Sequence, residues 1–284
     1  GNGGDPLAGD LFARELRHYL GQQIPFLPWA LFTTDPLVLE RWAVVPRPAF
    51  RMAVDAGYPT RILWDKLLAS CPPQTWYTNL ALLDIFPDSE LPDFENELRT
   101  AVLAHVFYPD MLPEILRYAG NVPDPVKLVI TTGNEESKAD LEARLGAQER
   151  FADWEVRVAT TNRGRDISAF LIDCEDVLRD ESVDIVLRLH SKRSVQDPSS
   201  VSGWFKDHLF ENLLHSPGHV QRIMSRFAEE PQLGMVMAPV IHMGVPTMGN
   251  GWTLNKGPAE DLAERLGVDI PFDTFTPLSP YGSM

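Results

Sequence analysis

The chain has 284 residues, of which 44% are hydrophobic and 23% charged, an ordinary balance for a globular protein. Its net charge of −15 argues against a nucleic acid as the main partner, because binding a phosphate backbone needs a broad basic surface. Two cysteines are too few for a disulfide or metal framework, and there is no run of about 18 apolar residues that would predict a membrane span.

Residues 1–95 are predicted to form a helical and irregular arm, because no regular alternation of strands and helices runs through them. Residues 10–20 have helix-spaced leucines, and residues 61–70 and 76–86 are typical of short amphipathic helices. Prolines between these segments break any longer element. Four tryptophans of the arm are interpreted as packing anchors rather than a binding cage: Trp29, Trp42, Trp64 and Trp76.

Residues 96–284 have a different pattern, in which apolar runs alternate with amphipathic helices. The apolar runs predict strands at residues 100–107, 126–132, 154–160, 184–189 and 233–240. Helices are expected around residues 112–119, 135–145, 166–178, 204–214, 219–227 and 258–266. This alternation predicts an α/β fold with a mainly parallel sheet flanked by helices. Cys174 lies among apolar residues of such a helix, which indicates a buried core thiol, and we expect a reducing compartment.

Polar residues gather at the ends of the predicted strands and directly after them. They are Thr131, Thr132 and Asn134 at and after the end of the second strand, Asn162, Arg163, Gly164, Arg165 and Asp166 after the third, and His190, Ser191, Lys192, Arg193 and Ser194 after the fourth. In an open parallel sheet, ligands bind at the carboxyl ends of the strands. Four cations at this edge of an acidic chain favour a bound di-anion such as a nucleotide diphosphate.

The stretch from Asn162 to Asp166 lies just before a predicted helix, where backbone N–H groups attract anions. Gly164 allows a close backbone approach, and Arg165 is suited to bind a phosphate with two hydrogen bonds. The alternative is a plain loop in which Asp166 caps the helix and pairs with Arg163. His208, His215 and His219 are not expected to form a metal site, and the chain has no Walker A, G-x-G-x-x-G or G-x-S-x-G motif.

Several short motifs occur in a fixed order along the chain. They are Ala104-His105-Val106-Phe107-Tyr108, Ile130-Thr131-Thr132, Val156-Arg157-Val158, Asn162-Arg163-Gly164-Arg165-Asp166, His190-Ser191-Lys192-Arg193-Ser194, Trp204, Leu233-Gly234-Met235 and the closing Tyr281-Gly282-Ser283-Met284. Together they resemble the rhamnan synthesis F family of bacterial polysaccharide-assembly glycosyltransferases. The preceding arm, with Ile24-Pro25-Phe26 and Gly57-Tyr58-Pro59, resembles the segment before this domain in the family.

This resemblance implies a GT-A-type fold and transfer of a sugar, often rhamnose, from a nucleotide donor such as dTDP-rhamnose to a growing, lipid-linked glycan. It places Thr131, Thr132 and Asn134 near the nucleoside. It places Asn162, Arg163, Gly164, Arg165, Asp166, Arg193 and Ser194 near the base, ribose or diphosphate. The expected location is the cytoplasm, at the inner face of the membrane. The chain stops inside the last motif of the family, so we expect the domain at residues 96–284 to be truncated at its C-terminal end.

His190 and Lys192 stand where sugar-nucleotide transferases often have two metal-binding aspartates. A lysine and an arginine supply positive charge directly, which predicts metal-independent chemistry, with Mg²⁺ or Mn²⁺ as the alternative. A third interpretation has His190 hydrogen-bonded in the core and Lys192 solvated. A carboxylate is needed as general base for a single displacement at the anomeric carbon; Asp273 is our first candidate and Asp110 the second.

Two other classes of protein stay open at this point. The domain is alternatively a catalytically silent glycan- or partner-binding module of a larger polysaccharide synthase, which the missing acidic pair and the truncated end favour. A Rossmann-like methyltransferase or dehydrogenase is the remaining alternative, but no Gly-rich turn follows residues 100–107, as that fold requires.

Overall fold

A computed structural model of the chain describes residues 29–41, 46–71, 73–86, 94–191, 201–239, 252 and 255–268. The chain divides into two compact units, residues 1–85 with 240–279 and residues 86–239 with 280–284. The domain boundary predicted after residue 95 stays a prediction, because compactness alone does not establish which segments fold independently.

The described part of the first unit is helical. Its helices are α2 (Ala30–Thr33), α3 (Pro36–Arg41), α4 (Arg47–Asp55), α5 (Thr60–Ser70), α6 (Pro73–Asn79) and α13 (Lys256–Leu266). Prolines stand at the starts of four of these helices: Pro36 and Pro73 begin α3 and α6, and Pro46 and Pro59 are the N-caps of α4 and α5. Proline suits such a position because the first N–H groups of a helix have no intrahelical partner. The helix predicted at residues 61–70 is confirmed as α5, and residues 10–20 and Trp42 lie outside the described residues.

Aromatic side chains form the core of the first unit. Trp76 is buried, and Trp29 and Trp64 pack against the same cluster, which includes Phe32 and Leu67. The rings of Trp64 and Trp76 meet edge to face, with centroids 5.6 Å apart and planes at 83°. Such contacts add to the stabilisation from buried area. The interpretation of Trp29, Trp64 and Trp76 as packing anchors is therefore confirmed.

The helix predicted at residues 76–86 is wrong in its extent. Helix α6 ends at Asn79, and Ala81 has a left-handed backbone with φ of 48°. The side-chain amide of Asn79 donates to the carbonyl oxygens of Phe32 and Thr34, at 2.8 and 2.9 Å. These bonds attach the end of α6 to the end of α2, so a contact with a distant segment accompanies the end of the helix.

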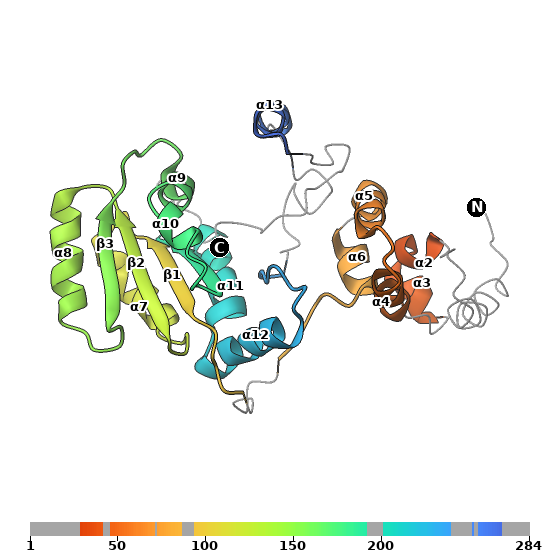
Figure 1. Cartoon of the computed structure of the whole chain (residues 1–284), viewed down its shortest axis with the longest axis horizontal. Coiled ribbons are helices and arrows are strands. Elements are labelled where there is room, and N and C mark those ends of the chain that lie inside the picture. Colours follow the sequence, from red (N-terminus) through yellow and green to blue (C-terminus); the bar gives the residue numbers. More distant parts are fainter. Residues whose placement is uncertain are drawn as a thin grey trace. The chain divides into compact units, whose positions relative to one another are not determined.

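The second unit contains a four-stranded parallel sheet (Figure 1). Its strands are β1 (Thr100–His105), β2 (Val126–Thr132), β3 (Asp153–Val158) and β4 (Ile185–His190), in the order β3-β2-β1-β4. The flanking helices are α7 (Leu112–Ala119), α8 (Glu135–Gly146), α9 (Arg165–Leu171), α10 (Glu175–Leu178), α11 (Val201–Leu214) and α12 (Pro217–Glu229), with a short 3₁₀ helix η1 (Pro109–Met111). The predicted α/β fold is confirmed.

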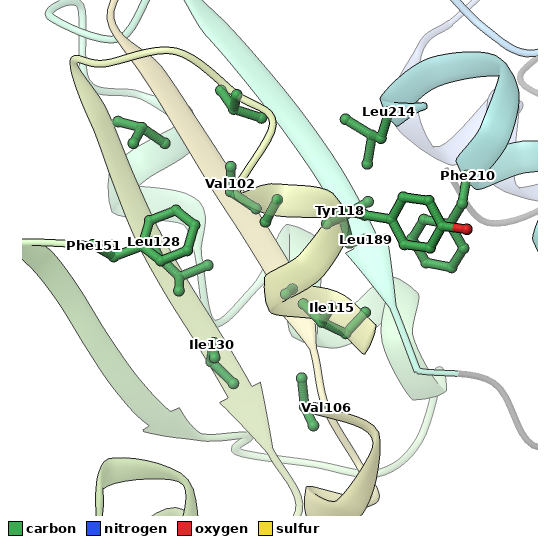
Figure 2. Close-up of a cluster of buried hydrophobic side chains, with 14 of the residues drawn as sticks. Val102, Val106, Ile115, Tyr118, Leu128, Ile130, Phe151, Leu189, Phe210 and Leu214 are labelled. Carbon is green, nitrogen blue, oxygen red and sulfur yellow. The ribbon is translucent and has the colours of Figure 1, made fainter. Parts of the chain in front are cut away.

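Alternate residues of each strand face two different helix layers. On one face, Val102, Leu128 and Leu189 pack with residues of α7, α8, α11 and α12. Figure 2 shows part of this core, in which the ring of Tyr118 from α7 stacks on Phe210 from α11 with centroids 4.7 Å apart. On the opposite face, residues such as Ala101, Leu103 and Val129 pack with Cys174 and Val177 beside α9 and α10. Cys174 is 1% exposed, so its assignment as a buried core thiol is confirmed.

Two predicted elements of this unit are wrong. The helix expected at residues 166–178 is two helices, α9 and α10, and the turn between them contains Asp173, whose carboxylate is hydrogen-bonded to Thr160. The strand expected at residues 233–240 is absent from residues 233–239, and Val240 lies outside the described residues. Ala238 and Val236 instead pack into the core between the sheet and helices α7, α8, α11 and α12. Burial of these side chains, without strand pairing, accounts for the apolar pattern.

Candidate functional site

The order of the sheet locates the candidate site. Helices α7 and α8 connect β1 to β2 and β2 to β3 along one face, whereas α9 and α10 connect β3 to β4 along the other. The chain therefore moves outward from β1 through β2 to β3 and then returns to place β4 on the other side of β1. In open α/β sheets, ligands bind outside the carboxyl ends of the strands at such a switch point. Here the switch point lies between β1 and β4.

Polar side chains form one row across the carboxyl end of the sheet. The strand registers pair His105 with both Thr131 and His190, and they pair Thr131 with Arg157. Residues in register on parallel strands point to the same face, so this row lies on the face covered by α9 and α10. His105 Nδ1 and Thr131 Oγ1 are hydrogen-bonded at 2.9 Å. The structure thus brings Thr131 and His190, two predicted site residues, into one row with His105 between them.

The switch point itself is closed by hydrogen bonds just beyond the strands. The Ser191 N–H donates to the His105 carbonyl oxygen at 2.8 Å, and the Phe107 N–H donates to Ser191 Oγ at 3.1 Å. Ser191 is 7% exposed. The segment that begins with Lys192 therefore follows a firmly held residue. Lys192, Arg193, Ser194 and Asp273 lie outside the described residues, so their predicted roles stay predictions.

Two predicted nucleoside-binding residues have internal hydrogen bonds. Thr132 is fully buried, and its hydroxyl donates to the Val106 carbonyl oxygen at 2.8 Å. The Asn134 side chain accepts from the Ser137 N–H at 2.8 Å and so caps α8. An N-cap of this kind satisfies one of the helix's first N–H groups. Both side chains therefore help to hold the carboxyl end of β2, and their contact with a nucleoside stays a prediction.

The loop between β3 and α9 carries two exposed arginines, Arg163 and Arg165. In the described part of the chain, neither side chain has a hydrogen-bond or ion-pair partner. Gly164 has φ of 94° and Arg165 has φ of 51°, so the backbone turns through the left-handed region here. Glycine adopts that region readily, whereas other residues adopt it at a cost.

Three of the first four N–H groups of α9, those of Arg165, Ile167 and Ser168, donate to backbone carbonyl oxygens. The Ile167 N–H donates to the Gly164 carbonyl oxygen at 3.1 Å, and the Arg165 N–H donates to the Asn162 carbonyl oxygen at 3.4 Å. This helix has only seven residues. In this loop, the groups that remain available to an anion are therefore the two arginine side chains rather than the start of the helix.

Asp166 does not pair with Arg163, so the alternative interpretation of this loop is wrong. Its carboxylate accepts from Arg188 Nη2 of β4, and the two side chains are 18% and 16% exposed. The N-cap of α9 is Gly164, with no side-chain hydrogen bond. The guanidinium of Arg188 also lies over the ring of Phe170, 5.3 Å from its centroid. A pair this poorly solvated fixes the start of α9 against β4.

Sequence reasoning missed Arg188, Asp173 and the bracing role of Arg157. Arg157 Nη1 donates to the Asp173 carbonyl oxygen at 2.7 Å, and its guanidinium binds both carboxylate oxygens of Asp176 at 2.6 and 2.9 Å. These bonds hold the α9–α10 turn on β3, and the hydrogen bonds to the carboxylates of Asp176 and Glu155 raise the pKa of Arg157. A signal was present in the sequence, because Arg157 and Arg188 each stand inside an apolar run. A charged residue at such a position indicates a specific partner, here on the face of the sheet that α9 and α10 cover.

His105 is electrically neutral at neutral pH. Burial lowers the pKa of its imidazole most strongly, the carboxylates of Asp166 and Asp173 raise it, and Arg188 lowers it, with a net decrease. The Nδ1 atom is engaged with Thr131. His105 therefore contributes hydrogen bonds rather than positive charge to this edge of the sheet.

Three further histidines, on or between α11 and α12, have hydrogen-bond partners of their own. His208 Nε2 is hydrogen-bonded to the Pro239 carbonyl oxygen at 2.8 Å, His219 Nε2 to that of Asn212 at 2.8 Å, and His215 Nδ1 to Glu211 at 2.7 Å. Among the described residues, no three His, Cys, Asp or Glu side chains are arranged to hold a metal ion. None of the helices in that part of the chain combines the length and apolar character needed to cross a membrane.

Comparison with known proteins extends these observations. Two curated relatives are 31% identical to the chain over 183 residues, and both carry the name "Uncharacterized protein WxcX", from two strains of Xanthomonas campestris pv. campestris. The aligned stretch covers 63% of this chain and 25% of each relative, so the chain spans about a quarter of their length. No solved structure matches the chain.

A family comparison covers nearly the whole sequence. The family described as "Rhamnan synthesis protein F" matches residues 11–284, which include most of the arm, the sheet and the closing motif. The resemblance drawn from the strand-end motifs is confirmed by this match. The family's description refers to the synthesis of rhamnan, a polysaccharide, and the chain belongs to the rhamnan synthesis protein F family.

Proposed function

We propose that this chain is the donor-binding part of a glycosyltransferase with a GT-A-type fold. It transfers a sugar, rhamnose, from a nucleotide donor such as dTDP-rhamnose to a growing bacterial surface polysaccharide. The observation that carries the proposal is the pair of exposed arginines, Arg163 and Arg165, without partners in the described part of the chain, at the carboxyl edge of a parallel sheet. On a protein with a net charge of −15, such a local cationic site favours a compact anion.

In the proposed reaction, an acceptor hydroxyl oxygen forms a bond to the anomeric carbon of the donor. The bond between that carbon and the diphosphate oxygen breaks, and its electron pair leaves with the diphosphate. Arg163 and Arg165 would stabilise this charge, together with Lys192 and Arg193. The hydroxyl proton passes to a carboxylate, for which Asp273 is our candidate. Because the cations supply positive charge directly, we propose that no metal ion is required.

The described geometry supports a prepared donor site. His190 and Thr131 flank His105 in one row, and Ser191 is bonded to β1 immediately before Lys192 in the chain. Asn162 and Gly164 shape the turn that carries the arginines, and Ser194 follows in the same segment as Lys192. We further propose that the acceptor is a lipid-linked glycan and that transfer takes place in the cytoplasm, at the inner face of the membrane.

The test is a calorimetric titration of the purified chain with dTDP, UDP and their sugar conjugates, in EDTA and with added Mg²⁺ or Mn²⁺. A bound ligand also raises the thermal stability of the folded state, which gives an independent signal. The double variant Arg163→Ala/Arg165→Ala is expected to lose most of the binding. Its matched control, Arg144→Ala/Arg179→Ala, removes two exposed arginines that pair with Asp140 and Glu175 on α8 and α10.

Binding that persists in EDTA and depends on Arg163 and Arg165 supports the proposal. Binding only with a divalent metal ion contradicts metal independence and points to carboxylate ligands. The absence of binding to every nucleotide contradicts the donor site and favours the second hypothesis, a catalytically silent binding module. Transfer of radiolabelled sugar from the nucleotide donor to a glycan acceptor separates an active transferase from that module.

A further inference from the structure

The loop that carries Arg163 and Arg165 is held at both ends by carboxylates. We define the cationic turn as residues 160–165. It leaves β3 at the carboxyl edge of the sheet and enters α9, and α9 and α10 cover one face of that sheet. Its position relative to β1 and β4 therefore decides where the two guanidinium groups stand with respect to the switch point.

The end of the cationic turn is fixed to β4. Asp166, the residue after the turn, accepts a hydrogen bond from Arg188, which is two residues before His190. Both side chains are largely excluded from solvent, at 18% and 16% exposure, so the pair is weakly screened by salt. Phe170 packs against the Arg188 guanidinium and limits its movement further.

The start of the cationic turn is fixed to the α9–α10 turn. Asp173 Oδ1 accepts from the Thr160 N–H at 3.0 Å, and the Asp173 carbonyl oxygen accepts from Arg157 Nη1 at 2.7 Å. Arg157 is itself held by Glu155 at 2.6 Å and by Asp176. The anchor therefore runs from β3 through Arg157 and Asp173 back to the first residue of the cationic turn.

The interior of the turn is ordered by its own bonds. The Arg163 N–H donates to Thr161 Oγ1 at 3.1 Å, and Ser168 Oγ donates to the Arg165 carbonyl oxygen at 2.9 Å. Gly164 provides the left-handed step between the two arginines. The backbone of the turn is thus bonded at its start, middle and end, while both cationic side chains project without partners in the described residues.

We propose that Asp166 and Asp173 are positioning residues that hold the cationic turn so that Arg163 and Arg165 meet the diphosphate, and that Asp166 acts through Arg188 and does not touch the donor. This inference rests on the proposed function. It differs from the prediction of Asp166 as a donor-binding residue. A carboxylate beside an incoming di-anion repels it, whereas one paired with Arg188 does not. Holding the turn in advance also reduces the entropy lost on binding.

The test compares two probes, dTDP and inorganic diphosphate, by calorimetry over a range of salt concentrations. Asp166→Asn and Arg188→Met are each expected to lower the affinity for both probes equally, by about tenfold. This corresponds to about 1.4 kcal/mol of binding free energy. Arg188→Lys is expected to restore part of the affinity, because it keeps a cation near Asp166. Asp173→Asn keeps an oxygen acceptor for Thr160 and is expected to bind better than Asp173→Ala.

The salt dependence separates contact from positioning. Loss of Arg163 or Arg165 should reduce the slope of binding affinity against salt, because an ionic contact is removed. The variants at Asp166 and Asp173 should leave that slope unchanged while the affinity falls. Asp140→Ala, which removes an exposed carboxylate of α8, is the matched control and should change neither quantity.

If Asp166→Asn lowers the affinity for dTDP but not for inorganic diphosphate, the inference is overturned, because that result indicates direct contact between Asp166 and the nucleoside. Hydrogen exchange supplies a readout that does not need a ligand. Amides of residues 160–168 should exchange faster in Asp166→Asn and Asp173→Ala, while those of β1 and β2 remain protected. Unchanged exchange there overturns the inference. Failure of the wild-type chain to bind either probe counts against the proposed function alone.

Discussion

His105 at the end of β1 is hydrogen-bonded through Nδ1 to Thr131 Oγ1 at the end of β2, at 2.9 Å. This bond connects two side chains that the strand register already places side by side. Because burial lowers the pKa of His105, a neutral imidazole sits at the centre of the polar row, next to the switch point. Positive charge at this edge of the sheet therefore comes from arginine and not from this histidine.

The pKa of His105 predicts how stability changes with pH. A histidine with a folded-state pKa below its ordinary value of 6.5 binds protons more readily in the unfolded state. Its contribution to stability is complete above that value and is lost as pH falls through the lowered pKa. As the pH is lowered from about 8 to about 5, the midpoint temperature of thermal unfolding should therefore fall more steeply for the wild type than for His105→Gln. Parallel curves for the two proteins would contradict this prediction.

Gly164 is predicted to be required for the cationic turn. Its φ is 94°, and a Cβ added there would stand 3.0 Å from the Cβ of Ser168. Gly164→Ala should therefore lower the free energy of unfolding by at least about 1 kcal/mol and weaken dTDP binding. Gly146→Ala is the matched control, because nothing lies within 4 Å of a Cβ there and no left-handed φ is required.

The control variant Gly146→Ala is expected to be neutral or to stabilise the protein by about 0.4–1 kcal/mol, because alanine reduces the entropy of the unfolded chain. Denaturant unfolding followed by circular dichroism measures both variants. Equal stability of the two variants would show that the left-handed step at Gly164 is dispensable.

Two substitutions at Thr132 distinguish a structural role of this residue from a role in binding the nucleoside. Thr132→Val keeps the shape of the side chain but removes the hydroxyl that donates to the Val106 carbonyl oxygen. Leaving a buried acceptor without its partner should cost about 1–3 kcal/mol of unfolding free energy. Thr132→Ser keeps the hydroxyl and should retain that bond. If Thr132→Val is fully stable but binds dTDP poorly, then the predicted contact with the nucleoside is the main role of this residue.

The core beneath the candidate site should be sensitive to truncation. Ile130 and Leu128 of β2 are fully buried on the face of the sheet that α7, α8, α11 and α12 cover (Figure 2). Ile130→Ala or Leu128→Ala should each lower the free energy of unfolding of the second unit by about 2–5 kcal/mol. Met235, which is 59% exposed, provides the control, and Met235→Ala should change stability by less than about 0.5 kcal/mol. A small effect at Ile130 would mean that the core adapts to the lost volume.

The sequence alone was sufficient to predict the four parallel strands of the second unit and the family of the chain. Apolar runs of strand length predicted β1, β2, β3 and β4, since burial on both faces of a parallel sheet requires continuous apolar residues. The alternation with helices predicted parallel pairing, and strand ends are recognisable because polar residues follow each run. The order of the motifs identified the family, which the match over residues 11–284 confirms.

Several features were decided only by the tertiary structure. The partner of Asp166 is Arg188, which lies 22 residues away, and the α9–α10 turn is held by Thr160 and Arg157 of a neighbouring segment. The end of α6 is fastened to α2 by Asn79, 47 residues from Phe32. The segment at residues 233–239 has an apolar pattern but is not paired as a strand. Periodicity reports which side chains are buried, whereas the partner of a polar group depends on which distant segment the fold brings next to it.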